Sequence, residues 1–165
     1  MSSNRMSAYR WFDSDVPTDI EVRQVYGFIF GPDGRILLLE DNGQYNLPGG
    51  KPEKGESFAE TLIREAEEEV QVTIASVRYL GYQLIVVPEV FAQVRLVALI
   101  NQIHLSATDP STGRQYSRLW VPPPLSSELL RWGESGNNQI ASAVAAISKL
   151  GVNWDGSPLV NVDSN

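Results

Sequence analysis

The stretch GGKPEKGESFAETLIREAEEEVQV, residues 49–72, decides the fold of this chain. It is a glycine-rich loop that runs into a segment whose apolar residues recur at helical spacing. At about 100° per residue, one arc of this helix carries the apolar side chains Phe58, Ala59, Leu62, Ile63, Ala66 and Val70. The pattern predicts an amphipathic helix whose apolar face packs on a core.

An adjacent arc of the same helix is acidic. Glu65, Glu68 and Glu69 follow the i, i+3, i+4 rule, whereas Glu67 points away from them toward solvent. Negative charge near a helix C-terminus is disfavoured by about 0.3–1 kcal/mol per residue, and several broken local preferences in one place indicate function. A divalent cation would convert the repulsion into ligation, and carboxylates without His or Cys favour Mg²⁺ or Mn²⁺ over Zn²⁺. A solvated Glu-rich helix without any site is the alternative.

The whole stretch resembles the Nudix box, Gly-x5-Glu-x7-Arg-Glu-U-x-Glu-Glu-x-Gly-U, in which U is a bulky aliphatic residue. The charged and glycine positions that match are Gly50, Glu56, Arg64, Glu65, Glu68 and Glu69, and Val72 matches the final aliphatic. Two positions depart from the pattern, because Ala66 is small and Gln71 replaces the last glycine. We expect Gln71 either to adopt a positive φ at a cost of about 1–2 kcal/mol or to let the helix end differently.

The resemblance implies a fold and an activity. The fold would be α/β, a Nudix-type α/β/α sandwich with a mixed sheet between helices. The activity would be that of a MutT-like pyrophosphohydrolase, which uses Mg²⁺ (or Mn²⁺) and an activated water to cleave the diphosphate linkage of a nucleoside diphosphate derivative. Nucleoside triphosphates, oxidised nucleotides and ADP-ribose-like conjugates all belong to that class. A nucleotide-binding sensor that has lost catalysis is the alternative.

The resemblance also implies roles for single residues. The metal ligands would be Glu65, Glu68 and Glu69, joined by the backbone carbonyl of Gly49. Glu68 would in addition activate the water or orient it. Arg64 would hold a box carboxylate in place, either Glu56 or Glu69. The expected catalytic residues are therefore Glu68, Arg64 and Glu56. The alternative for Arg64 is an ordinary helix salt bridge to Glu68.

Residues outside the acidic arc are weaker candidates. Lys51 is a cation close to the acidic arc, and Tyr45 stands where the family commonly has Trp, as a base contact or a core-edge aromatic. Arg114 and Tyr116 are candidate substrate contacts on a polar loop. Many family members carry another acid in a late loop, and three residues here could serve: Asp109, Glu128 or Glu134.

Composition limits the other possibilities. The chain has 165 residues, with 42% hydrophobic and 20% charged residues, which suits one soluble domain. Its net charge of −7 argues against a broad nucleic-acid surface, so we expect a small nucleotide as partner. With no cysteine and one histidine, His104, it offers neither a thiolate metal site nor a His-based triad. No apolar run long enough for a membrane span is present, and we expect a cytoplasmic monomer or homodimer.

Patterning predicts an N-terminal arm at 1–20, a Nudix hydrolase domain at 21–151 and a C-terminal tail, loosely held, at 152–165. Strand-like runs occur at 21–30, 35–40, 75–87, 90–103 and 118–121. The first two runs predict one hairpin and the third and fourth a longer one. Beyond the box helix, we expect a short helix at 128–132, capped by Ser126 or Ser127, and a long helix at 138–150.

Overall fold

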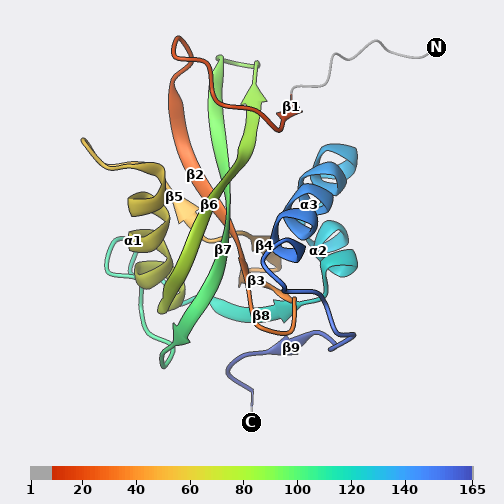
Figure 1. Ribbon diagram of the computed structural model, residues 1–165. Helices are drawn as coiled ribbons and strands as arrows, with labels where there is room; N and C mark the ends of the chain where they lie inside the picture. Colours follow the sequence, from red (N-terminus) through yellow and green to blue (C-terminus); the bar gives the residue numbers. More distant parts are fainter. Residues whose placement is uncertain (1–8, 165) are drawn as a thin grey trace, which may run out of the picture.

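The computed structural model describes residues 9–164, so the first eight residues of the expected N-terminal arm and the last residue of the tail lie outside it. Figure 1 shows one twisted sheet between two helical layers. The strands are β1 (Tyr9–Phe12), β2 (Val22–Phe30), β3 (Ile36–Asp41), β4 (Gln44–Asn46), β5 (Gly49–Gly50), β6 (Val72–Ile85), β7 (Phe91–Ile103), β8 (Ser117–Val121) and β9 (Val160–Asn161). The helices are α1 (Phe58–Val70), α2 (Pro123–Leu130) and α3 (Gly133–Ser148).

The sheet is mixed, with strand order β1-β6-β7-β2-β3-β8-β9, while β4 pairs with β3 and β5 with β2. The long β6–β7 hairpin is present as predicted. Strand β2 pairs with β3 only at Phe30 and Ile36, and its main partner is β7, to which it runs parallel. The expected hairpin at 21–40 is therefore nearly absent. The chain turns from β2 into β3, but most residues of β2 pair with β7, which lies about seventy residues later in the chain.

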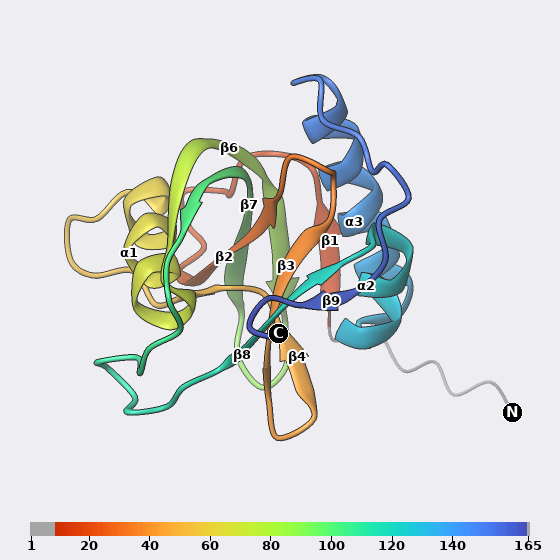
Figure 2. The ribbon, with the colours of Figure 1, turned by 90° about the horizontal axis from the view of Figure 1, so that it is seen from below.

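Two cores flank the sheet. Helix α1 covers one face, where Leu62, Ala66 and Val70 are fully buried, and α3 covers the other, where Ala143 and Ile147 are. Figure 2 shows the helices on opposite sides of the strands. The mixed sheet between helices confirms the predicted α/β sandwich. No helix in residues 9–164 is long and apolar enough to cross a membrane.

The C-terminal half departs from the expected boundaries. Helix α2 begins at Pro123, with prolines in its first turn, because a proline there needs no hydrogen-bonded N–H. Helix α3 begins at Gly133, five residues before the expected start. The tail is held rather than loose, since β9 pairs with β8 and Asp163 forms an ion pair with the buried Arg118.

Candidate active site

Helix α1 places the acidic residues at one edge of the sheet. Its first turn is capped by the Ser57 hydroxyl, which accepts a hydrogen bond from the Glu60 amide at 3.1 Å. Ala66 is completely buried, so the small side chain at this box position lets the helix lie close to the strands. Glu67 is exposed, as expected. The burial of one face thus presents Glu65, Glu68 and Glu69 along the other.

Arg64 is the charged centre of the box. Its Nε lies 2.8 Å and its Nη2 3.0 Å from the two carboxylate oxygens of Glu56, a bidentate pair. Its Nη1 lies 2.9 Å from Glu65 and 3.5 Å from Glu68. Of the two expected partners it is Glu56, not Glu69, that Arg64 holds, and the contact with Glu68 is the longest of the three.

The Glu56–Arg64 pair predicts a pH dependence of stability. Arg64 foremost, helped by the Glu53 amide and the Thr61 hydroxyl, lowers the pKa of Glu56 from 4.5 to about 2. A folded-state pKa below the unfolded value means that this stabilisation is present above about pH 4.5 and is lost as the pH falls toward 2. Between pH 7 and 3 the unfolding free energy of the wild type should therefore fall more than that of Glu56→Gln, by about 1–3 kcal/mol. Urea denaturation measures this, with the exposed Glu60→Gln as control; equal pH slopes in wild type and Glu56→Gln would contradict it.

Backbone close to the helix explains both glycines. Gly49 has φ 154°, and a Cβ there would lie 2.1 Å from the Val25 carbonyl oxygen. A Cβ on Gly50 would lie 2.5 Å from a carboxylate oxygen of Glu65. A side chain at Gly49 would therefore collide with the backbone of β2, whereas one at Gly50 would displace the Glu65 carboxylate.

Glu69 is the most deeply placed acid of the arc. The Gly49 amide donates a hydrogen bond to it at 2.8 Å. Burial, together with the charges of Glu65, Asp109 and Glu68, raises its pKa to about 8. Burial also raises the pKa of Glu65. Both carboxylates are thus in surroundings that disfavour uncompensated negative charge.

Gln71 follows the first of the two expectations and adopts a positive φ at the helix end. It adopts the left-handed conformation, φ 53° and ψ 46°, that the family glycine would occupy. Its side chain then makes two hydrogen bonds: Nε2 donates to the Glu68 carbonyl oxygen and Oε1 accepts from the Ala107 amide, each at 3.1 Å. The helix therefore ends at the expected residue, and the glutamine ties the helix end to the loop after β7.

Replacing Gln71 tests this compensation. We expect Gln71→Ala to lower the unfolding free energy by about 1–2 kcal/mol, because it loses two hydrogen bonds and keeps the positive φ. Gln71→Gly should lose less, since glycine relieves the backbone strain by about 1 kcal/mol. Urea denaturation of both variants measures the difference. An alanine variant as stable as the wild type would show that the side-chain bonds contribute nothing.

Asp109 is the acid from the late loop that reaches the box. It is 2% exposed, and its carboxylate accepts a hydrogen bond from the Ser111 amide at 2.8 Å. Its charge contributes to the raised pKa of both Glu65 and Glu69. The same loop contacts the helix through the Ser111 hydroxyl, which lies 3.1 Å from Glu68. The other two candidates are exposed on the far side of the sheet, Glu128 on α2 and Glu134 on α3.

The predicted substrate contacts divide into two groups. Tyr45 and Tyr116 line a cavity of about 250 Å³ that also includes Gly49 and Glu69. Lys51 is exposed on the loop before α1, and its carbonyl oxygen accepts a hydrogen bond from Arg64. Arg114 is exposed and forms an ion pair with Asp41.

Tyr26 of β2 also lines this cavity, and sequence reasoning missed it. It lies in a strand dense in apolar residues, where nothing in the local pattern distinguishes a site residue from a core residue.

The acids suit a divalent cation without forming a ready-made site. Within residues 9–164, no three acidic side chains already converge on a point where they could hold a metal ion. The Arg64 guanidinium lies between Glu65 and Glu68 instead. The donor set still fits Mg²⁺ or Mn²⁺, since the charges of Glu68 and Asp109 are close enough to contribute to the raised pKa of Glu65 and Glu69, and carboxylate oxygens are the preferred ligands of hard cations.

Comparison with known proteins agrees with this geometry. The NUDIX domain family model matches residues 21–131. No curated protein matches the sequence significantly. Among solved structures, the Bacillus subtilis pyrophosphohydrolase BsRppH is similar at 26% identity and a TM-score of 0.52, over 60% of this chain and 63% of that protein, which is less than two thirds of its length.

Two further structures are similar over nearly their whole length. The MutT protein from Methanosarcina mazei Go1 matches at 19% identity and a TM-score of 0.56, covering 79% of this chain and 99% of its own. The Escherichia coli dihydroneopterin triphosphate pyrophosphohydrolase matches at 17% identity and a TM-score of 0.52, covering 77% and 99%. At these identities the likeness concerns the fold. With the family model spanning two thirds of the chain, and with the charged box residues assembled on α1 and, for Glu56, on the loop just before it, the protein belongs to the Nudix hydrolase family.

Proposed function

We propose that this protein is a Mg²⁺-dependent pyrophosphohydrolase, with Mn²⁺ as a possible substitute, that cleaves the diphosphate linkage of a nucleoside triphosphate. The observation that carries the proposal is a cavity of about 250 Å³ beside the acidic arc, which Glu69 and Gly49 help to line. A second cavity, of about 290 Å³, adjoins it, and Tyr26 and Asn46 line both. One base with one phosphate chain suits two such cavities better than a conjugate with two nucleosides does.

Glu68 is the proposed base. A water oxygen attacks phosphorus, the bond from phosphorus to the bridging oxygen breaks, the leaving phosphate departs with the electron pair, and Glu68 accepts the water proton. Glu69 is less suited to this role, because it is buried and already accepts a hydrogen bond from Gly49. When bound, a divalent cation at Glu65, Glu68 and Glu69, with the Gly49 carbonyl and Asp109 nearby, would neutralise phosphate charge and lower the pKa of a bound water.

Arg64 and Glu56 support the base without touching the substrate. Arg64 is anchored by the bidentate pair to Glu56, and from that anchor it orients the Glu65 and Glu68 carboxylates. Tyr45 and Tyr116, as walls of the cavity, are proposed substrate contacts. Lys51, beside the loop, and Arg114 are proposed only as outer contacts for phosphates.

A hydrolysis screen tests the proposal. Release of phosphate or pyrophosphate is measured from nucleoside triphosphates and 8-oxo-dGTP, and formation of AMP is measured from ADP-ribose, each with Mg²⁺, with Mn²⁺ and with EDTA. We expect turnover of at least one nucleoside triphosphate that EDTA abolishes. Tight nucleotide binding without turnover of any substrate would instead identify a sensor and overturn the proposal.

The loop acid gives a separate prediction. Asp109→Asn keeps the shape and the hydrogen bond from Ser111 but removes the charge, and we expect kcat to fall about 10- to 100-fold. Glu128→Gln, an exposed acid on α2, is the matched control and should leave kcat unchanged. Steady-state kinetics at saturating Mg²⁺ measures both. Equal activity of the two variants would remove Asp109 from the site.

A further inference from the structure

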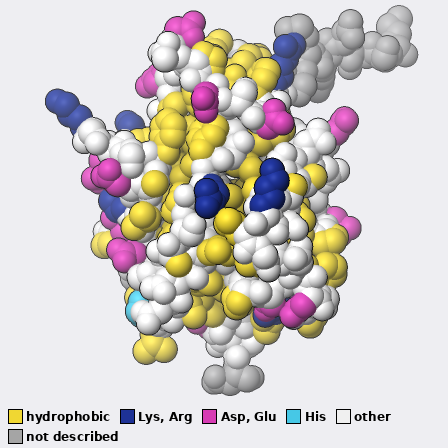
Figure 3. Space-filling view, viewed as in Figure 1, with side chains coloured by type: hydrophobic (Ala, Val, Ile, Leu, Met, Phe, Trp, Pro, Cys, Tyr) yellow, Lys and Arg dark blue, Asp and Glu magenta, His cyan; other side chains and the backbone are white. Residues whose placement is uncertain are grey.

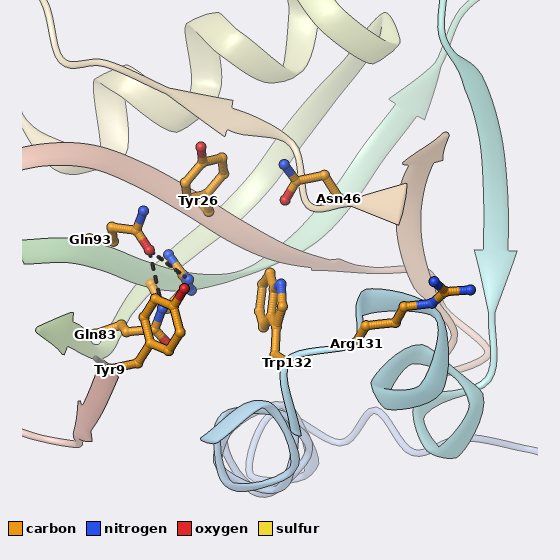
Figure 4. A pocket seen from close by; sticks show the side chains of 8 residues that line it. Tyr9, Tyr26, Asn46, Gln83, Gln93, Arg131 and Trp132 are labelled. Carbon is orange, nitrogen blue, oxygen red and sulfur yellow. Dashed lines mark hydrogen bonds between the residues drawn. The ribbon is translucent and has the colours of Figure 1, made fainter. Parts of the chain in front are cut away.

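The second cavity has an unusual lining. It lies between the sheet and the α2–α3 connection, and the described residues that line it are aromatic and amide side chains and two arginines, none of them acidic. Figure 4 shows the rings of Tyr26 and Trp132 facing the cavity from different elements, with Asn46 beside them, while Arg131 extends away. On the face shown in Figure 3, basic side chains lie near the centre among apolar ones and acidic side chains lie mostly nearer the rim. Although the chain has a net charge of −7, no described residue in the lining of this cavity is negatively charged.

Arg95 is the buried cation of the cavity. It is 2% exposed, its Nε donates to Gln139 at 2.9 Å and its Nη2 to Gln93 at 3.3 Å. Its guanidinium lies 5.1 Å from the Tyr26 ring and 4.8 Å from the Trp132 ring. In the described part of the chain it has no carboxylate within ion-pair distance, and its buried Nη1 has no hydrogen-bond partner. Burial lowers its pKa only to about 10, so it stays charged at neutral pH.

The amide network around Arg95 uses its acceptors internally. Gln93 Oε1 accepts from Arg95 and from Gln83 Nε2, and Gln83 Oε1 accepts from Gln139 Nε2 at 2.7 Å. Asn46 Oδ1 accepts from the Leu47 amide at 2.9 Å. The Gln83 and Gln93 acceptors are therefore occupied, whereas Arg95 Nη1 remains a donor without a partner among the described residues. A buried charged donor without a partner is strongly unfavourable, and a ligand with acceptor atoms would satisfy it.

The cavity lies next to the proposed site of hydrolysis. Tyr26 and Asn46 line both hollows. Burial is the largest cause of the raised pKa of Tyr26. The charge of Arg95 lowers this pKa, and the charges of Glu69 and Glu65 raise it, so the phenol lies close to both the arginine and the acidic arc. A nucleotide with its phosphates beside Glu69 would thus extend its base toward Arg95.

We propose that this cavity binds the base of the nucleotide substrate, and that Arg95 selects bases that present adjacent acceptors, a 6-oxopurine over a 6-aminopurine. Guanine and hypoxanthine carry O6 and N7 side by side, the edge that an arginine binds with two hydrogen bonds, whereas adenine places its N6 amino donor there. Arginine has only donors, so adenine leaves one unsatisfied. The inference rests on the proposed function only in taking the ligand to be a nucleotide.

Binding to the wild type is the first test and needs no turnover. Calorimetry without added metal compares GMP, IMP, AMP and 7-deaza-GMP, which share one phosphate group. GMP and IMP should bind about 5- to 150-fold tighter than AMP, and 7-deaza-GMP, which lacks N7, should bind more weakly than GMP. AMP binding as well as GMP, or no binding of any monophosphate, would overturn the inference.

Variants separate selection from packing. Arg95→Met should bring the GMP to AMP affinity ratio close to one. Trp132→Leu should weaken both nucleotides alike and keep the ratio, because a ring surface does not distinguish purines. Arg78→Met, an exposed arginine on β6, is the matched control and should keep both affinities. If Arg95→Met does not fold, the wild-type comparison with 7-deaza-GMP decides alone.

Hydrolysis measured in parallel keeps the two proposals apart. A preference for GMP and IMP with no turnover of GTP or ITP would leave the base selection standing and overturn the proposed function. Turnover of GTP and ATP with equal kcat/KM, together with equal affinities for GMP and AMP, would support the proposed function and overturn the base selection.

Discussion

Replacement of Glu68 by glutamine is expected to lower kcat by about 10²- to 10⁴-fold, because the amide cannot accept the water proton. The change preserves size, and the carboxylate it replaces is only partly buried: it accepts a hydrogen bond from the Ser111 hydroxyl and forms an ion pair with Arg64 at 3.5 Å. We therefore expect little change in the unfolding free energy. Steady-state kinetics on the best substrate of the screen, with circular dichroism to verify folding, measures the effect.

Glu67→Gln is the matched control, since Glu67 is the adjacent glutamate and faces solvent. It removes the same charge from the same helix and should leave kcat within about two-fold, because solvent and salt screen an exposed charge that points away from the acidic arc. If Glu68→Gln retained full activity, Glu68 would not be the base, and Glu69→Gln would become the decisive variant.

Loss of Arg64 should have the second largest effect, on stability and activity together. Arg64→Met leaves Glu56, whose side chain is 11% exposed, and Glu65, at 15%, without their cation. Because the site is only partly buried, we expect the unfolding free energy to fall by about 2–3 kcal/mol, below the range for fully buried pairs. The Glu65 and Glu68 carboxylates would lose the contact that orients them, and kcat/KM should therefore fall about 10- to 100-fold.

A double-mutant cycle separates these two effects. Adding Glu56→Gln to Arg64→Met removes the stranded charge and should recover part of the stability, while activity stays low because Glu65 and Glu68 remain unsupported. Urea denaturation and kinetics of the four proteins measure the coupling. Additive stability losses would mean that the Glu56–Arg64 pair is electrostatically unimportant.

Much of the site follows from local rules. Glu65, Glu68 and Glu69 share an arc because helix geometry fixes the spacing of residues three and four apart. The Ser57 cap and the apolar face of α1 are equally local, and they set where the helix begins and which side is buried. The acidic arc could thus be predicted with its residue numbers, and the structure places Glu65 and Glu69 beside the glycine loop.

Other parts of the site have no local signal. Asp109 was one of three candidate acids, and only the path of the loop after β7 brings it to Glu65 and Glu69. Arg95 could be assigned to one face of its strand by alternation, but its isolation from any carboxylate depends on Gln139 of α3 and on Trp132. The parallel pairing of β2 with β7, which sets Tyr26 beside Arg95, joins segments about seventy residues apart.

The sequence by itself determined the helix, its buried side, its acidic arc and the bidentate pairing capacity of Arg64, because these depend on spacing within about ten residues and on side-chain chemistry. Tertiary structure alone decided which acid joins the arc, how Gln71 compensates for the absent glycine, and that the base cavity contains a buried arginine whose Nη1 has no hydrogen-bond partner among the described residues. Those features depend on contacts between side chains from strands, helices and loops that are distant in the chain. The spacing of residues within one segment does not specify such contacts.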